Sequence, residues 1–190
     1  IRDFSQLQSF RLMDPYKDNK SVRRPTPVEI EAFLVFGSYD FHSLASTYPV
    51  PEYSIPRMEK ITEAADKLAD ARTLLLHSRT ANGKSVFADM LSLELFSRGI
   101  TGVRYRSRSS ITPQELDFLR EIEKLVIFIP TYDDAIEISD ELKGLGERAK
   151  FVVEVNTGTE QIRRTETQTY LAKPILRLDL NVLSDGDRRD

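Results

Sequence analysis

Five short apolar segments, separated by stretches with helical periodicity, dominate the sequence after Arg72. Successive strands joined through helices need crossover connections, and right-handed crossovers place such strands parallel in one sheet. The pattern predicts an α/β fold, a three-layer sandwich around a five-stranded parallel sheet, in which LVIFI is a central strand covered on both faces. The five segments are TLLLH (73–77), GVRYR (102–106), LVIFI (125–129), FVVEV (151–155) and ILRLDL (175–180).

The segments between these predicted strands carry helix start and stop signals. One helix is expected from Lys84 to Arg98, where Gly99 stops it, and another begins at Thr112 as cap with Pro113 in the first helical position. Two more are expected in DDAIEISDELKGLG (133–146) and in TEQIRRTETQTYLA (159–172), the weakest of the four patterns.

The first 51 residues differ from the rest, because they are rich in aromatic residues and interrupted by prolines. They hold one clear helix signal, in which Thr26 is the cap, Pro27 takes the first helical position and Glu29 completes a capping box. An amphipathic helix follows at 57–72. We therefore expect a helical or irregular N-terminal segment at 1–51, ahead of the sheet domain.

Composition excludes several classes of protein. The chain has no cysteine and only two histidines, His42 and His77, so thiolate chemistry is excluded and a zinc site or a Ser/His/Asp triad is not expected. With 27 Lys+Arg against 30 Asp+Glu, a nucleic-acid surface is not indicated. No apolar run approaches the roughly 18 residues that span a bilayer, and no signal peptide is recognisable, so no membrane partner and a cytoplasmic location are expected.

A phosphate-binding motif follows the first predicted strand. The pattern GxxxxGK[ST] fits residues 78–85, except that a serine stands where the first glycine belongs. Backbone amides of such a loop, and of the helix that it opens, converge on a phosphate. The expected nucleotide contacts are Ser78, Arg79, Thr80, Ala81, Asn82, Gly83, Lys84, Ser85 and Val86.

Three residues of this motif have distinct expected roles. Gly83 lets the chain turn close to the phosphate, Lys84 neutralises the β- and γ-phosphates, and the Ser85 hydroxyl binds Mg²⁺. The structural alternative is a strand-to-helix turn in which Lys84 is merely solvated. Ser78 keeps that alternative open, because the first glycine normally allows a tight turn without a side chain in the way.

Residues 52–183 resemble the nucleotide-binding core of STAND P-loop NTPases, a branch close to the AAA+ group. The resemblance rests on four stretches: ARTLLLHSRTANGKSVFADMLSLEL, KLVIFIPTYDDAIEISDEL, KFVVEVNTGTEQIRR and ILRLDLNVLSD. It implies ATP or another NTP with Mg²⁺ as cofactors, and a nucleotide-controlled module within a larger signalling or antiviral defence protein. Other domains of the same chain, and further copies on activation, are the implied partners.

The resemblance also implies roles for individual residues. Ile55 and Arg57 would contact the base and the phosphates, although Pro56 before a helix has an ordinary structural explanation. Asn156 would be the polar sensor of the γ-phosphate, or simply a turn residue at a strand end. Arg163 and Arg164 would reach a neighbour's nucleotide in an assembly, or form a solvated helix face.

The third predicted strand departs from the family pattern. Relatives end it with an acidic residue that orients magnesium, whereas LVIFI runs into Pro130. Asp133 and Asp134 follow three and four residues later, too far along an extended chain unless the loop folds back. As catalytic candidates they stand beside Lys84 and Asn156, but capping of the next helix is the favoured role for both.

Three functions remain open from the sequence. The first is a regulatory NTPase that binds Mg·ATP with weak or absent hydrolysis. The second is a degenerate scaffold that links an effector and a sensor without nucleotide, and the third, less favoured, is a small-molecule kinase. Because the chain starts at Ile1 and ends in SDGDRRD, we expect a piece of a longer polypeptide, with 184–190 beginning an absent helical lid.

Overall fold

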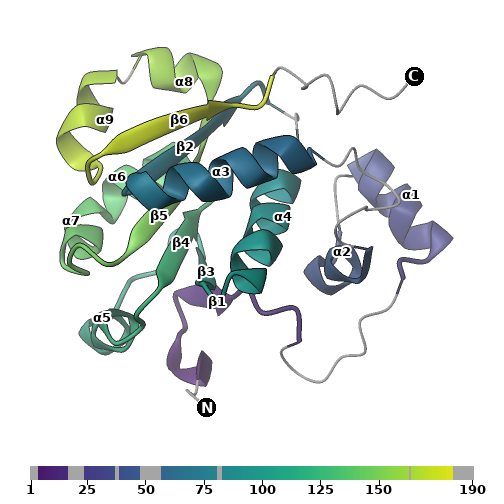
Figure 1. Ribbon diagram of the computed structural model, residues 1–190, viewed down its shortest axis with the longest axis horizontal. Helices are drawn as coiled ribbons and strands as arrows, with labels where there is room; N and C mark the ends of the chain where they lie inside the picture. Colours follow the sequence, from purple (N-terminus) through teal and green to yellow (C-terminus); the bar gives the residue numbers. More distant parts are fainter. Residues whose placement is uncertain are drawn as a thin grey trace.

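The computed structural model describes residues 4–16, 24–36, 39–47, 57–80, 83–162 and 164–181. Six strands form one sheet in the order β1-β3-β4-β5-β2-β6 (Figure 1). The strands are β1 (Phe10–Leu12), β2 (Thr73–Ser78), β3 (Thr101–Tyr105), β4 (Leu125–Ile129), β5 (Lys150–Asn156) and β6 (Ile175–Asp179).

The five predicted strands correspond to β2 to β6, and all of their pairings are parallel. The prediction of five strands was one short, because β1 adds an antiparallel edge strand beside β3. β1 is only three residues long, FRL, and has no alternation from which a strand could be recognised. Its place is fixed by burial of Phe10, which is 1% exposed.

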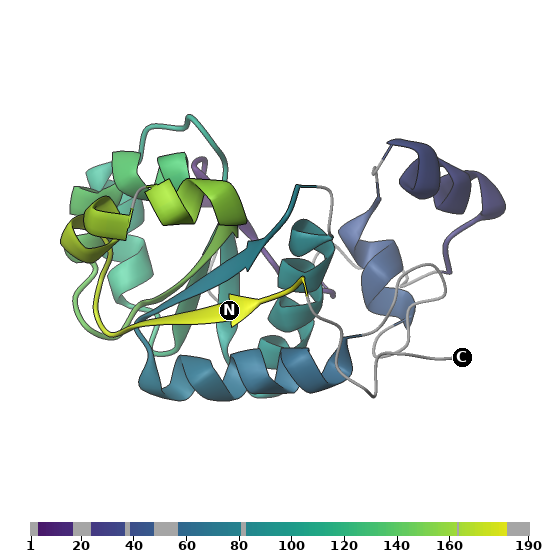
Figure 2. The ribbon, with the colours of Figure 1, turned by 90° about the horizontal axis from the view of Figure 1, so that it is seen from above.

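Helices cover both faces of the sheet, and Figure 2 shows the sheet between the two layers. α3 and α4 pack on one face, with Leu74, Leu76 and Phe128 pointing toward them. α5, α6 and α7 pack on the other face, against side chains such as Ile127 and Val153. The predicted three-layer α/β sandwich is therefore present. The helices on these faces are α3 (Met58–Asp70), α4 (Lys84–Ser97), α5 (Pro113–Arg120), α6 (Tyr132–Glu137), α7 (Ser139–Lys143), α8 (Thr157–Ile162) and α9 (Arg164–Tyr170).

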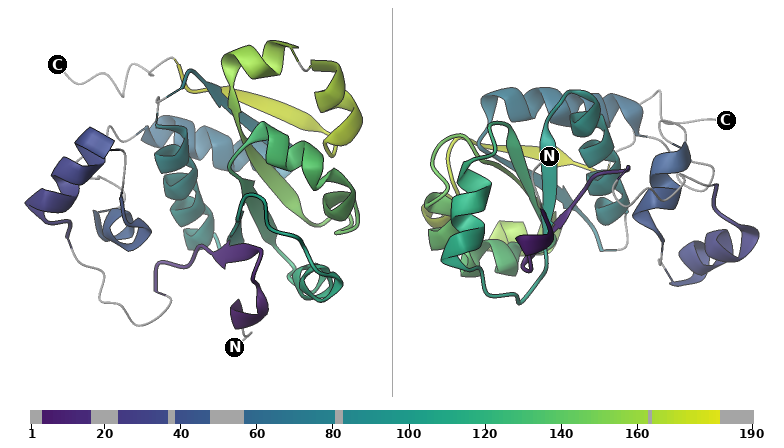
Figure 3. Two further views of the ribbon diagram at one scale, coloured as in Figure 1. Left: turned by 180° about the vertical axis from the view of Figure 1, so that it is seen from behind. Right: turned by 90° about the horizontal axis from the view of Figure 1, so that it is seen from below.

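The N-terminal segment contributes η1 (Phe4–Gln6), α1 (Pro27–Phe36) and α2 (Phe41–Thr47). Figures 1 and 3 show α2 near α4 and α1 farther out, both on the side of α4 away from the sheet. α2 belongs to the hydrophobic core that includes α4, because Phe41 and Leu44 are buried there. The predicted boundary at residues 51 and 52, and the start of the lid at 184–190, lie outside the described residues.

The predicted capping signals are present. The Thr26 amide donates to Glu29 Oε2 at 2.8 Å, and the Glu29 amide donates to Thr26 Oγ1 at 3.4 Å. Thr112 and Glu115 make the same reciprocal pair at the start of α5. Among the described residues, none of the helices combines the length and apolar character needed to cross a bilayer.

The strand order determines which strand ends meet. β2 lies between β5 and β6, with Ser78 opposite Asn156 and His77 opposite Asp179. Because β2, β5 and β6 are parallel, their carboxyl ends lie at one edge of the sheet, where α4 begins. In open α/β sheets this edge is the usual place of ligand binding.

Candidate functional site

The connection from β2 to α4 is built around Gly83. Gly83 has φ of +69° and caps α4, and its carbonyl accepts the first helical hydrogen bond from the Phe87 amide at 2.9 Å. A Cβ at Gly83 would meet nothing within 4 Å, so the backbone conformation, and not lack of space, favours glycine there. Ala81 and Asn82, two of the predicted contacts, lie outside the described residues.

The side chain of Lys84 folds back over this connection. Its ammonium donates to Asn156 Oδ1 at 2.9 Å, to the Arg79 carbonyl at 3.0 Å and to Ser78 Oγ at 3.3 Å. Burial lowers the pKa of Lys84, and the Glu154 carboxylate opposes this shift. The cation therefore lies at the carboxyl ends of β2 and β5, held by acceptors that an anion could replace.

Asn156, whose role as a sensor stays a prediction, lies beside this cation. It ends β5, directly opposite Ser78 in the register, and its amide oxygen faces the Lys84 ammonium. Ser78 is fully buried, and its hydroxyl donates to the Arg79 carbonyl at 3.0 Å. The serine that replaces the first glycine is therefore accommodated as part of the turn.

Ser85, the predicted magnesium ligand, has an acidic partner that the sequence did not point out. Its hydroxyl donates to Glu154 Oε2 at 2.8 Å. Glu154 lies in β5, opposite Leu76 of β2, and is 5% exposed. The available signal was a single charged residue within FVVEV, five residues that are all buried in the structure.

Behind Glu154 lies a chain of buried polar side chains. The Arg104 guanidinium pairs with Glu154 Oε1 and, at 2.6 Å, with Asp89 Oδ1. The Tyr39 hydroxyl donates to the other oxygen of Asp89 at 2.7 Å. Burial raises the pKa of Glu154 and of Asp89, although Arg104 opposes both shifts. These contacts connect Ser85 through β5, β3 and α4 to the segment before α2.

The two aspartates after β4 lie in the first turn of α6. The Asp134 carboxylate accepts hydrogen bonds from Thr131 Oγ1 at 2.6 Å and from Ser107 Oγ at 2.7 Å. The Thr131 hydroxyl in turn accepts from the Asp134 amide and caps the helix. Asp133 is exposed on the same turn. The described hydrogen bonds of Asp134 thus tie α6 to the loop after β3, and do not lead to Ser85.

The remaining predicted contacts lie in different places, and some of them lie near the same edge of the sheet. Arg79 and Thr80 are exposed, and the Arg79 amide donates to Asn181 Oδ1 at 2.8 Å. Arg57 donates to the Leu180 carbonyl at 3.1 Å, which fixes the start of α3 beside the end of β6. Val86 is 8% exposed and packs in the core. Ile55 and Arg163 lie outside the described residues, and Arg164 begins α9.

The donor set suits magnesium bound together with phosphate. The described part of the chain has no group of three or more His, Cys, Asp or Glu that could hold a metal alone. Mg²⁺ in nucleotide sites commonly takes one or two protein oxygens and completes its shell with phosphate oxygens and water. Ser85 and Glu154 offer such hard oxygen donors beside the Lys84 ammonium.

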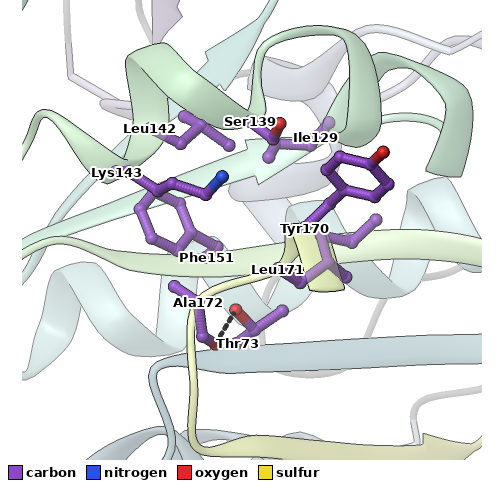
Figure 4. A pocket seen from close by; sticks show the side chains of 10 residues that line it. Thr73, Ile129, Ser139, Leu142, Lys143, Phe151, Tyr170, Leu171 and Ala172 are labelled. Carbon is purple, nitrogen blue, oxygen red and sulfur yellow. Dashed lines mark hydrogen bonds between the residues drawn. The ribbon is translucent and has the colours of Figure 1, made fainter. Parts of the chain in front are cut away.

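A small pocket on the other face of the sheet has a different character. Figure 4 shows it between α7 and the end of α9, with a mostly apolar lining and Lys143 as its charged side chain. The Lys143 ammonium lies 5.9 Å from the centroid of the Tyr170 ring, and Thr73 Oγ1 donates to the Ala172 carbonyl at 2.7 Å. Its volume of about 10 Å³ has room for about one water molecule, so it is not a nucleotide site.

No protein-family model matches the chain, and no curated protein matches it. Among solved structures it is similar to Hsp104 of S. cerevisiae in complex with casein, with 14% identity and a TM-score of 0.51 over 68% of this chain. DnaI is 15% identical, with a TM-score of 0.43 over 74% of this chain and 88% of its own. PCH-2 of C. elegans is 12% identical, with a TM-score of 0.42 over 90% of this chain and 48% of its own.

The similarity to Hsp104 supports the fold alone, because so low an identity carries no information on activity. The chain spans 27% of the length of the Hsp104 chain that it matches. The sheet order, the parallel core strands and this similarity agree on one architecture. The chain therefore has an α/β fold similar to that of the matched part of Hsp104.

Proposed function

We propose that this chain is a nucleotide-binding regulatory module, a STAND-like NTPase that binds ATP with Mg²⁺ and hydrolyses it slowly or not at all. The observation that carries the proposal is the position of Lys84. Its ammonium lies at the carboxyl ends of β2 and β5, beside the amino end of α4, and contacts Asn156 and Ser78. A cation and a helix amino terminus at one point form an anion site, and Ser85 adds the hydroxyl for a metal.

Slow hydrolysis is proposed because of what surrounds this site. Phosphoryl transfer depends on positioned charges and on a residue that orients the attacking water. Pro130 follows β4 where the family places an acid, and Asp134 is engaged with Thr131 and Ser107 at the start of α6. Asn156 can contact a γ-phosphate, but its amide cannot act as a general base that takes a proton from the attacking water. We therefore expect the site to bind ATP but to hydrolyse it slowly.

The wider role rests on the resemblance stated from the sequence. STAND modules lie between an effector and a sensor within longer chains, and many act in antiviral defence. We propose that nucleotide occupancy controls the packing of this core against such neighbouring domains and against further copies. In this proposal, exposed Arg79 and Thr80 contact a lid that covers the nucleotide, because the Arg79 amide donates to Asn181 near the end of the described chain.

Calorimetric titration with ATP and Mg²⁺ tests the proposal. Lys84→Ala should remove detectable binding, a loss of more than about 2 kcal/mol, because it deletes a charged partner of the phosphates. Lys124→Ala is the matched control, since Lys124 is exposed just before β4 at the opposite end of the sheet. If Lys84→Ala bound ATP as tightly as the control does, the proposed site would be wrong.

A second candidate, a scaffold that needs no nucleotide, is favoured by one observation. The hydroxyl of Ser78 and the ammonium of Lys84 both bind the Arg79 carbonyl, so the connection is closed by the protein's own groups. A structural turn would have the same contacts. Such a scaffold would show no change in thermal stability with millimolar Mg·ATP, whereas a ligand that binds only the folded chain must raise it.

A further inference from the structure

The register of the sheet identifies the position at which an acid is missing. Ile129, the last residue of β4, pairs with Val153 of β5, so Pro130 follows beside Glu154. Side chains alternate along strands, and Phe128 and Val152 lie in the core beneath α4. The next positions on that face are 130 and 154. An acid at 130 would point toward the start of α4, but proline occupies that position.

Glu154 brings a carboxylate to the same place from the neighbouring strand. Its Oε2 lies 2.8 Å from the hydroxyl of Ser85. Its other oxygen is paired with Arg104, whose guanidinium also binds Asp89. A buried carboxylate with partners on both oxygens has a fixed orientation, and a fixed orientation is what a residue needs in order to position a metal ligand.

The charges around Glu154 favour a cation. The side chains of Glu154 and Asp89 are 5% and 3% exposed, and both buried carboxylates share the guanidinium of Arg104. In the free protein the Lys84 ammonium lies nearby and interacts with Glu154. Once Lys84 binds phosphate, the Glu154 carboxylate loses part of this compensation on the side that faces Ser85. A buried charge without compensation is costly, and a divalent cation beside Ser85 would compensate it.

We propose that Glu154 takes over the role of the acid absent after β4: it positions the Ser85 hydroxyl and the Mg²⁺ ion that enters with the nucleotide. Glu154 is a positioning residue, since it acts through Ser85 and the water around the metal. The inference rests on the proposed nucleotide function, and it specifies which carboxylate makes binding depend on the metal. No acid at the end of β4 is then required for tight binding of Mg·nucleotide.

The test compares ATP affinity with Mg²⁺ and with EDTA, measured by calorimetry on the 190-residue chain. In the wild type, Mg²⁺ should tighten ATP binding. Glu154→Gln keeps the size of the side chain and an acceptor for Ser85 but loses the charge. It should reduce the metal-dependent gain in affinity by about 10- to 100-fold, the usual loss for partners of metal ligands, and it should not weaken ATP binding in EDTA.

Asp134→Asn is the matched control. It removes a buried carboxylate that belongs to the start of α6 and follows the same strand β4. It should leave the metal-dependent gain as in the wild type. Glu154→Asp provides a second reading if the glutamine variant does not fold, because it keeps the charge for Arg104 while withdrawing the oxygens from Ser85. It should lose part of the same gain.

The outcomes separate this inference from the proposed function. A full metal-dependent gain in Glu154→Gln, or in Glu154→Asp where that variant must be used, overturns the role of Glu154. Loss of the gain in Asp134→Asn instead would assign that role to α6 and overturn the inference equally. If the wild type binds ATP with the same affinity in Mg²⁺ and in EDTA, the inference is overturned but the nucleotide site remains. No binding of ATP at all overturns both.

Discussion

Lys84 uses all three donors of its ammonium group on acceptors of the protein itself. A phosphate must replace those hydrogen bonds in order to bind, so the net gain per contact is smaller than the gross strength of a charged hydrogen bond. Asn156 and Ser78 thereby hold the cation at the site before any ligand arrives. The same contacts satisfy the hydrogen-bond donors of Lys84 within the protein. Only a binding measurement therefore separates a nucleotide site from a structural turn.

Glu115 should make the stability of the fold depend on pH. Burial raises the pKa of Glu115, but hydrogen bonds from the amides and hydroxyls of Thr112 and Ser9 outweigh it, so the pKa lies below its ordinary value. The folded chain then binds fewer protons than the unfolded chain. The resulting stability is complete above the ordinary pKa of about 4.3, and it is lost as the pH falls through the lower folded value.

Glu115→Gln should therefore lower the free energy of unfolding by about 1 to 2 kcal/mol at pH 7, since charged hydrogen bonds are replaced by neutral ones. Below pH 4 the difference from the wild type should shrink. Urea unfolding at a series of pH values measures both effects. Glu121→Gln, exposed at the end of the same helix, should stay within about 0.5 kcal/mol of the wild type. A constant difference at every pH would mean that the Glu115 charge contributes nothing.

At the level of single residues, the sequence predicted the groups that follow one another in the chain. Gly83, Lys84 and Ser85 are consecutive, so the local backbone alone sets their positions relative to one another. Glu154 was not predicted, because its partners Ser85 and Arg104 are distant in sequence and meet it only through the order of the strands. A charge within an apolar strand indicates a buried partner, but it does not say which one.

At the scale of elements, periodicity identified the five parallel strands and the helices between them, whose apolar positions repeat clearly. β1 was missed for a physical reason. Its three residues are held as a strand by contacts distant in sequence. These are the pairing with β3 and the hydrogen bonds from the neighbouring Ser9 amide and hydroxyl to Glu115. The predicted helix at 133–146 is divided into α6 and α7, since Ile138 departs from helical geometry between them.

Tyr39 joins the N-terminal segment to α4, so its substitution should weaken the contact between these two parts. Its hydroxyl donates to Asp89 at 2.7 Å, and its ring packs edge-on against Phe33 of α1. Tyr39→Phe keeps the ring contact and removes the hydrogen bond to a buried carboxylate. We expect the free energy of unfolding to fall by about 1.5 to 3 kcal/mol, as for other hydrogen bonds to charged groups.

Chemical denaturation measures this loss, with Tyr170→Phe as the control. Tyr170 is 41% exposed at the end of α9, so removal of its hydroxyl should leave stability unchanged. If Tyr39→Phe matched that control, the N-terminal segment would not be held to the core through Asp89. Equal ATP affinity in Tyr39→Phe and the wild type is also expected, because Arg104 remains to hold Glu154.

At the scale of the whole molecule, the structure is a three-layer sandwich in which both helical layers bury apolar faces of one sheet. Lys84, Ser85 and Asn156 lie at one edge of that sheet, near the carboxyl ends of β2 and β5. Ligand binding at such an edge joins two strands and the start of α4, which are elements of the global core. Binding there should therefore stabilise the entire domain and not a single loop.

The last prediction follows from this coupling. With Mg·ATP at about 100 times its dissociation constant, mass action adds about 2.7 kcal/mol of stability, provided that the unfolded chain does not bind. For a chain of this size, that amount raises the melting temperature by about 5 to 10 °C. Lys84→Ala should show no rise, because the phosphates lose their cation. Replacement of Mg²⁺ by EDTA should reduce the rise, because Ser85 and Glu154 then have no metal to hold. Thermal unfolding monitored by circular dichroism measures all three, and a wild-type melting temperature unmoved by Mg·ATP would favour the scaffold over the nucleotide-binding module.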